Sequence, residues 1–208
     1  MEAPGINQLL ALAIAICFAA GLNLSAVLLT LGLLAQADVL TLPGPIAMIG
    51  EWWVIAISAA LCVVELLADK IPAFDLIWNA LMTFVRVPAG ALLAFVATDS
   101  LGPGLQLAAA TAGGAITLTA HSAKLALRGT ASASPEPFSN IGLSVIDDVA
   151  AVGLTWFAVE HPYIAGAIVV ALLAAALLLI RWVLGALRAV FRGASRQWAQ
   201  GGTGSPAP

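Results

Sequence analysis

Two adjacent carboxylates, Asp147 and Asp148, lie in the middle of an apolar segment that covers residues 138–159. At the helical rise per residue they lie about 14 Å from its start, near the middle of a bilayer. An ionised carboxylate there costs at least about 2.5–3.5 kcal/mol, so a proton, a cation or a basic partner must neutralise it. The pair therefore predicts a proton- or cation-coupling site that faces the interior of a helix bundle. The alternative is a structural role, in which one carboxylate caps a helix break or pairs with Lys124 or Arg86.

Short polar interruptions recur in the two halves of the chain, at residues 21–25 (Gly-Leu-Asn-Leu-Ser) and 114–119 (Gly-Ala-Ile-Thr-Leu-Thr). Polar, helix-weakening residues at bilayer depth are tolerated only where they face protein or a water-filled cavity, and a matched pair indicates a transporter binding site. We therefore expect the first and fourth spans to be broken and to approach each other at these places. The expected substrate-binding residues are Asn23, Ser25, Thr117, Thr119 and His121. The alternative is ordinary helix packing through small residues and interhelical hydrogen bonds.

Further charged residues lie at the ends of the second apolar segment. Glu65 and Asp69 are one helical turn apart and share a face, and Lys70 follows them. With Arg86 they predict a cytoplasmic gate or a contact to a lipid phosphate head group; a solvated helix end with a salt bridge to Arg86 is the alternative. Glu51, at the opposite end of the segment, is expected to join the coupling pair, as the inverted counterpart of Asp147.

The composition indicates where the chain resides. Of its 208 residues, 62% are hydrophobic and 9% are charged, against roughly 25% charged residues in a soluble domain, and its mean hydropathy is +1.04. No motif for a phosphate, a cofactor or nucleic acid is present, and Cys17 and Cys62 lack metal-type spacing. We expect a protein that is not an enzyme, has no cofactor and binds no nucleic acid; a metal site is left open.

The apolar segments predict an all-α polytopic membrane protein. Turn residues separate six spans at approximately 6–34, 46–68, 84–98, 104–128, 138–159 and 163–190. Lys and Arg in short loops mark the cytoplasmic side. With six spans, the basic residues of the connections and the C-terminal region fall on one side: Lys70, Arg86, Lys124, Arg128, Arg188, Arg192 and Arg196. We expect a multi-pass protein of the bacterial inner membrane with both termini in the cytoplasm and a first span that is retained.

The spans are expected to form two inverted three-helix repeats, because an odd number of crossings reverses the second copy. The first repeat covers residues 1–100 and the second covers 101–192; residues 193–208 are expected to be a disordered cytoplasmic tail. Within the first repeat, apolar residues recur at helical spacing over 73–85, with polar residues on another face. This segment predicts an amphipathic helix at the membrane interface.

A family resemblance covers most of the chain. The run from Glu65 through Asp-Lys-Ile-Pro (69–72) to Arg-Val-Pro-Ala-Gly (86–90) resembles the signature of a bacterial membrane family known as domain of unknown function 4126, and residues 21–23 and 137–148 are similar to it as well. Asn79 and Met82 depart from the acidic residue and histidine expected of many relatives. The resemblance implies no established activity.

The residues favour secondary transport or permeation of a small solute, coupled to a cation or a proton, with a midplane site between the two repeats. Two other classes are open: a lipid-handling protein such as a carrier-lipid flippase, and a non-catalytic membrane scaffold subunit. A lipid-handling protein predicts a groove beside Arg86 that is open sideways to the bilayer. A transporter predicts a closed cavity between the first and fourth spans, and a scaffold predicts tight packing there. The expected partners are the bilayer and a small solute or cation, with a homo-oligomer left open.

Overall fold

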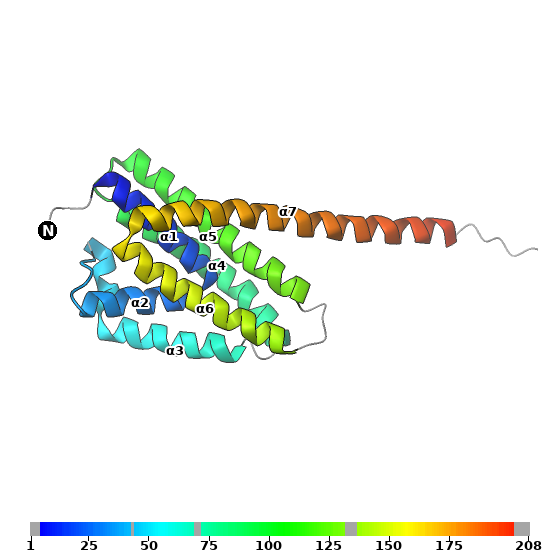
Figure 1. The fold of residues 1–208 in the computed structure, drawn as a ribbon, viewed down its shortest axis with the longest axis horizontal. Coiled ribbons are helices and arrows are strands. Elements are labelled where there is room, and N and C mark those ends of the chain that lie inside the picture. The colour runs from blue at the N-terminus through cyan, green and yellow to red at the C-terminus, as the bar shows by residue number, and fades with distance from the viewer. Residues whose placement is uncertain (1–4, 43, 69–71, 132–136, 202–208) are drawn as a thin grey trace, which may run out of the picture.

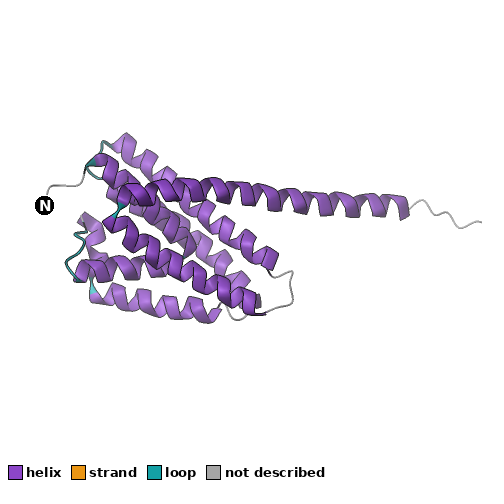
Figure 2. Cartoon of the chain, in the orientation of Figure 1, coloured by secondary structure: helices purple, strands orange, loops and turns teal. Residues whose placement is uncertain are grey.

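The structure, a computed structural model, describes residues 5–42, 44–68, 72–131 and 137–201, and these fold almost entirely into helices (Figures 1 and 2). In chain order the elements are α1 (Ile6–Leu22), α2 (Leu24–Gln36), the 3₁₀-helix η1 (Gly44–Gly50), α3 (Trp52–Ala68), α4 (Pro72–Ala97), α5 (Pro103–Ala131), α6 (Pro137–Glu160) and α7 (Pro162–Gly201). The all-α fold expected from the sequence is confirmed.

Three of the described helices contain a stretch that is long and apolar enough to cross a membrane: Ile77–Ala97, Gly142–Glu160 and Pro162–Ala189. Taken together, η1 and α3 form a fourth candidate, with a bend of 65° between them. Large apolar side chains cover the outer surfaces of these helices; Phe84 and Leu178 are 80% and 67% exposed. Such surfaces suit lipid rather than water, and the chain is a helical membrane protein.

The first apolar segment forms a hairpin of two antiparallel helices. Ser25, at the start of α2, hydrogen-bonds Glu65 near the end of α3. Gln36, at the end of α2, donates to the carbonyl of Gly50, just before α3. Helix α2 is therefore antiparallel to α3. Helix α1 packs alongside α5, and its direction is opposite to that of α2 (Figure 1). The outer ends of α1 and α2 lie at the same end of the bundle, and their junction lies inside it.

This hairpin changes the expected topology. The break is where the sequence predicts it, at Asn23, whose backbone is extended (φ −151°, ψ 104°). However, residues 6–34 enter and leave the bundle at the same end instead of crossing it as one broken span. The described helices therefore do not confirm six spans.

The turn at Asn23 is stabilised by the residue itself and by the glycine before it. The Asn23 side chain accepts a hydrogen bond from the Ala26 N–H, which satisfies one of the free donors at the start of α2. At Gly21 a Cβ would lie 2.5 Å from the Thr117 carbonyl oxygen, so only glycine lets α1 approach α5 this closely. The glycine of the first interruption therefore serves a close helix contact.

The second interruption does not break its helix, so the expectation of a broken fourth span is wrong. Residues 114–119 lie within α5, which is one continuous α-helix. Thr117 is fully buried, and its hydroxyl donates to the Cys17 carbonyl oxygen at 2.8 Å. The two interruptions do approach each other, as predicted, but through this packed contact between α1 and α5.

The amphipathic segment 73–85 is not a separate interfacial helix but the first part of α4, which continues through Pro88 to Ala97. Asn79 and Arg86 are buried in the bundle, whereas Ile77 and Phe84 are exposed on its outer side. The polar face thus points inward and the apolar face outward, the arrangement that suits lipid around the helix.

The last helix is longer than expected. Helix α7 contains 40 residues and extends well beyond the other helices (Figure 1). Where the sequence predicts a disordered tail from residue 193, the helix continues to Gly201; residues 202–208 lie outside the described residues.

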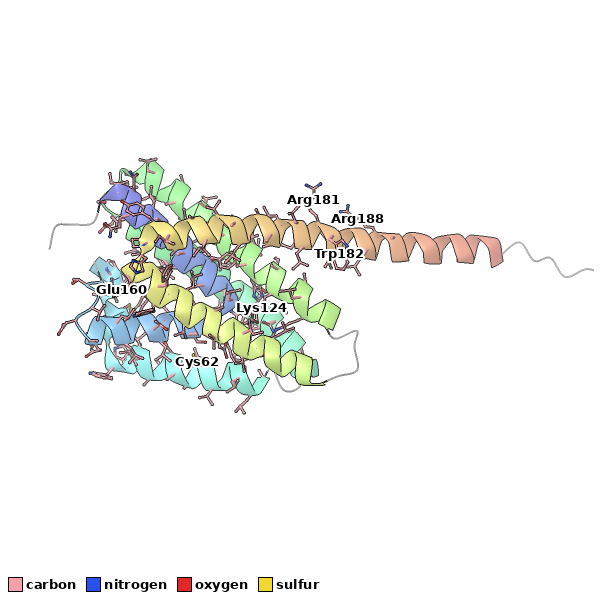
Figure 3. The ribbon with its side chains drawn as sticks, viewed as in Figure 1. Cys62, Lys124, Glu160, Arg181, Trp182 and Arg188 are labelled. Atoms are coloured by element: carbon pink, nitrogen blue, oxygen red, sulfur yellow. The ribbon has the colours of Figure 1, made fainter. Side chains whose placement is uncertain are left out.

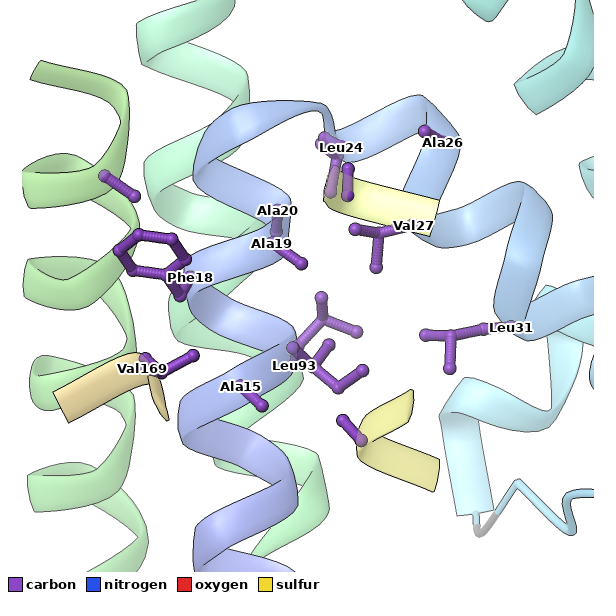
Figure 4. Packing of buried hydrophobic residues seen from close by; sticks show 14 of the residues in the cluster. Ala15, Phe18, Ala19, Ala20, Leu24, Ala26, Val27, Leu31, Leu93 and Val169 are labelled. Atoms are coloured by element: carbon purple, nitrogen blue, oxygen red, sulfur yellow. The ribbon is translucent and has the colours of Figure 1, made fainter. Parts of the chain in front are cut away.

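Small side chains fill the centre of the bundle. Helix α1 contacts α4, α5, α6 and α7, and its alanines Ala15, Ala19 and Ala20 are fully buried. Val27 and Leu31 of α2 continue this core (Figure 4). A helix buried on all sides is apolar all round, which explains why α1 carries few polar residues before its tip.

Candidate functional site

Charged and polar side chains from α2 to α6 converge on the tip of the α1–α2 hairpin. We call this group the tip cluster; its members are Asn23, Ser25, Glu65, Arg86, His121, Lys124, Arg128, Ser144, Asp147 and Asp148. Lys124 lies among the helices of the bundle, in contrast to Arg181 and Arg188 on the extension of α7 (Figure 3).

Asn23 is the centre of the tip cluster. Its Oδ1 accepts from the Ala26 N–H at 2.9 Å, and its Nδ2 donates to Asp148 Oδ1 at 2.7 Å. These two contacts fix the orientation of the amide, because only the oxygen can accept and only the nitrogen can donate. Asn23 thereby joins the start of α2 to the carboxylate of α6.

Ser25 and Glu65 connect the tip to α3. The Ser25 hydroxyl oxygen lies 2.8 Å from Asn23 Oδ1 and 2.5 Å from Glu65 Oε2. A hydroxyl carries a single proton, so it donates to one of these oxygens at a time. The other carboxylate oxygen of Glu65 forms a short ion pair with Arg86, and both side chains are buried.

His121 of α5 links Arg86 to two further groups of α4. Its Nδ1 lies 3.0 Å from Arg86 Nη1, and because a guanidinium cannot accept a hydrogen bond, Nδ1 must be the acceptor. The ring proton is then on Nε2, which lies 2.8 Å from Thr83 Oγ1 and 3.3 Å from the Asn79 carbonyl oxygen. This arrangement requires a neutral imidazole.

Lys124 and Arg128 hold the other side of the tip. Lys124 Nζ donates to the Leu22 carbonyl oxygen at 2.7 Å and lies 3.3 Å from Asp147 Oδ2. Arg128 lies 3.5 Å from the same carboxylate oxygen and donates to Ser144 at 2.9 Å. Asp147 is thus shared by two cationic side chains of α5.

The charges match the polarity of the helix ends. A helix carries partial negative charge at its C-terminus and partial positive charge at its N-terminus. Lys124 binds the end of α1, and the carboxylates Glu65 and Asp148 lie beside the start of α2. With a neutral His121, three carboxylates of the cluster face three basic side chains: Glu65, Asp147 and Asp148 against Arg86, Lys124 and Arg128.

Some residues predicted for the site lie elsewhere. Thr119 is only half-buried on α5, where its hydroxyl donates to the Ala115 carbonyl oxygen, because it lies two positions from buried Thr117 and so on another face. Glu51 is exposed just before α3, at the opposite end of that helix from Glu65. Asp69 and Lys70 lie outside the described residues. The other predicted substrate and coupling residues meet in or beside the tip cluster.

The sequence prediction did not include Lys124, Arg128 and Ser144 among the site residues, although Lys124 was considered as a partner of Asp147. A signal for the two basic residues exists in the sequence. Polar residues recur every three or four positions along one face of α5, and all of them are buried: Thr117, His121, Lys124 and Arg128. A buried polar stripe on a membrane helix marks the side that faces the bundle interior.

The described residues contain no group of three or more His, Cys, Asp and Glu side chains placed to hold a metal ion. They do form an apolar groove between α1, α6 and α7 that is open to the side, with a volume of about 480 Å³. Leu22 lines the end of this groove next to the tip, and Gly153 lies along it. The groove is not beside Arg86, where the lipid-handling alternative expects one.

The family model described as "Domain of unknown function (DUF4126)" matches residues 10–182. No curated protein and no solved structure matches the chain.

Proposed function

The chain belongs to the DUF4126 family, and from its tip cluster we propose that it is a membrane transporter or permease for a small solute, coupled to a cation or a proton. One observation carries this proposal: a charge-balanced group of buried and half-buried ionisable residues surrounds the tip of a helical hairpin inside a bundle of apolar helices. Ionisable residues within a membrane bundle are costly and mark ion or substrate pathways. Two helix ends that meet at such a site are a recurring device of transporters.

The position of the hairpin suggests a topology. We propose that α1 and α2 form a re-entrant hairpin and that α3 to α7 cross the membrane. With 17 residues in α1, the tip lies about 25 Å from the outer end of the hairpin, within a hydrocarbon core of about 30 Å. Basic residues lie near the end of α5 and along the last part of α7, at the end of the bundle opposite to the start of α1, so that end is proposed to face the cytoplasm. This topology places the N-terminus on the outer side, whereas the six-span topology predicts both termini in the cytoplasm. The inverted duplication and the bacterial inner membrane stay predictions.

Transport is tested with purified protein in vesicles that enclose a pH-sensitive dye or a dye sensitive to Na⁺ or K⁺, under imposed proton, Na⁺ or K⁺ gradients. A small-molecule cell extract is included to supply the solute. We expect the wild-type protein to give cation or proton flux and Asp148→Asn to lower it at least tenfold, because the amide cannot titrate or carry charge. Glu51→Gln, at the exposed end of α3, is the matched control and should retain flux. Wild-type flux equal to that of empty vesicles, or unchanged flux in Asp148→Asn, would contradict transport.

The apolar groove supports lipid handling as a second candidate. It opens sideways between helices whose outer surfaces face lipid, and one of its lining residues, Leu22, offers its carbonyl oxygen to Lys124. An acyl chain of a bilayer lipid in the groove would therefore bring its polar head toward the charged tip.

This candidate predicts the effect of filling the groove. A Cβ at Gly153 meets no atom within 4 Å, so a side chain can be added there without a clash at its Cβ, and Gly153→Leu is expected to fill part of the groove. If lipid moves along the groove, this variant should slow the exchange of a fluorescent phospholipid between leaflets at least tenfold. The matched control is Gly142→Leu on the same helix, where a Cβ also meets no atom within 4 Å. Equal exchange by the wild-type protein, both variants and empty vesicles would rule out lipid handling.

A further inference from the structure

The contacts of Lys124 resemble those of a bound monovalent cation. Its ammonium group meets two oxygens, the Leu22 carbonyl oxygen at 2.7 Å and Asp147 Oδ2 at 3.3 Å. Carbonyl and carboxylate oxygens are also the ligands that hard cations prefer. The Leu22 carbonyl lies at the C-terminus of α1, where the helix dipole adds negative potential. The side chain of Lys124 is only 4% exposed.

We propose that the Leu22 carbonyl and the Asp147 carboxylate form a monovalent-cation site in which the Lys124 ammonium is a tethered cation that a free Na⁺ or K⁺ displaces. This inference rests on the proposed transport function and names the coupling ion class of its site. The displaced ammonium moves away from the cluster, so one single charge replaces another at the two oxygens and the balance of three negative and three positive charges in the tip cluster is preserved. A divalent ion would not preserve this balance, and the described residues contain no group of three metal-ligating side chains.

The geometry also indicates what displacement would do. Lys124 joins α5 to the end of α1 and to Asp147 of α6. A free cation can replace the ammonium at both oxygens but has no link to α5. Entry of the ion would therefore loosen the hairpin tip from α5, while the contact between the tip and α6 persists. Such a change of contacts at one site is what coupling between ion binding and helix movement requires.

The site is tested first with Lys124→Met, which keeps the length of the side chain and removes its charge. The purified variant is unfolded in detergent at constant ionic strength in NaCl, KCl or choline chloride. We expect Na⁺ or K⁺, but not choline, to stabilise it, with the unfolding equilibrium constant falling about tenfold for each tenfold rise in cation above its dissociation constant. Adding Asp147→Asn should abolish the response, whereas adding Glu51→Gln should not. Equal stability of Lys124→Met in all three salts would overturn the site.

A second measurement uses the wild-type protein and does not depend on how the variant folds. The sequence contains only two lysines, Lys70 and Lys124, so Lys70 serves as an internal reference for modification by a small amine-acylating reagent. Mass spectrometry should show the ratio of Lys124 to Lys70 acylation rising several-fold in Na⁺ or K⁺ relative to choline. An unchanged ratio overturns displacement. If cation flux is observed but neither the stability of Lys124→Met nor the acylation of Lys124 depends on the cation, transport is retained and the cation site is overturned. If both depend on the cation but no flux is observed, the cation site is retained and transport is overturned.

Discussion

Replacing Arg86 by methionine is expected to destabilise the folded protein by about 3–5 kcal/mol, because it leaves Glu65 as a buried charge without its basic partner. Arg86 and Glu65 side chains are only 1% and 7% exposed, so water cannot replace the lost guanidinium. The substitution also removes the donor to His121 Nδ1. Denaturant unfolding in detergent micelles, followed by tryptophan fluorescence, measures the change.

Two comparisons isolate the ion pair as the cause. Arg181→Met makes the same chemical change on the exposed surface of α7 and should alter stability little. The double variant Arg86→Met with Glu65→Gln removes the uncompensated charge and keeps an acceptor for Ser25, so it should recover most of the loss. A double variant as unstable as Arg86→Met would show that packing of the arginine, and not the buried charge, sets the cost.

Asn23→Asp is expected to destabilise the hairpin tip and to abolish most flux, although it differs from asparagine by a single polar group. The aspartate can still accept from the Ala26 N–H, but it cannot donate to Asp148, which lies 2.7 Å away. A hydrogen bond to a charged group contributes about 1.5–3 kcal/mol, and the two carboxylates would in addition repel each other. We expect the free energy of unfolding to fall by at least that amount at neutral pH in the same unfolding experiment.

The loss of folding stability in Asn23→Asp should change with pH in one direction only. At lower pH a proton shared between the two carboxylates restores a hydrogen bond and removes the repulsion. The gap to wild type should therefore narrow as the pH falls from 7 toward 5. Asn7→Asp, the same change at an exposed position in the first turn of α1, should not lower stability, since a negative charge there suits the helix dipole. A gap that widens at lower pH would contradict the proposed contact.

Much of this structure follows from single-sequence signals. The composition indicates a membrane protein, and the polar residues around Asn23 mark the place where the first apolar segment breaks. The depth of Asp148 indicates a bundle-facing carboxylate, and the structure brings it to Asn23. These features depend on local hydrophobicity and on the high cost of burying a charge, which the sequence records directly.

The rest depends on packing between helices. The break at Asn23 is visible in the sequence, but the direction of α2 after it is set by contacts with α3, such as that of Ser25 with Glu65. Gly21 and Thr117 resemble helix-weakening residues, yet they serve a close contact between α1 and α5. Polar side chains in a membrane helix can mark either a break or a packed face, and only the neighbouring helix distinguishes the two.

The proposed transport function and the proposed cation site rest on one geometric feature, the return of α2 to the end of the bundle at which α1 begins. Labelling with a membrane-impermeant thiol reagent tests it most directly, using single cysteines at Asn7, Asp38 and Gly201 in a Cys17→Ser, Cys62→Ser background. We predict that positions 7 and 38 are labelled from one side of the membrane and position 201 only from the other. A first segment that crosses the membrane would instead place position 7 on the side of position 201 and away from position 38. That result would remove the hairpin tip, and with it the proposed site.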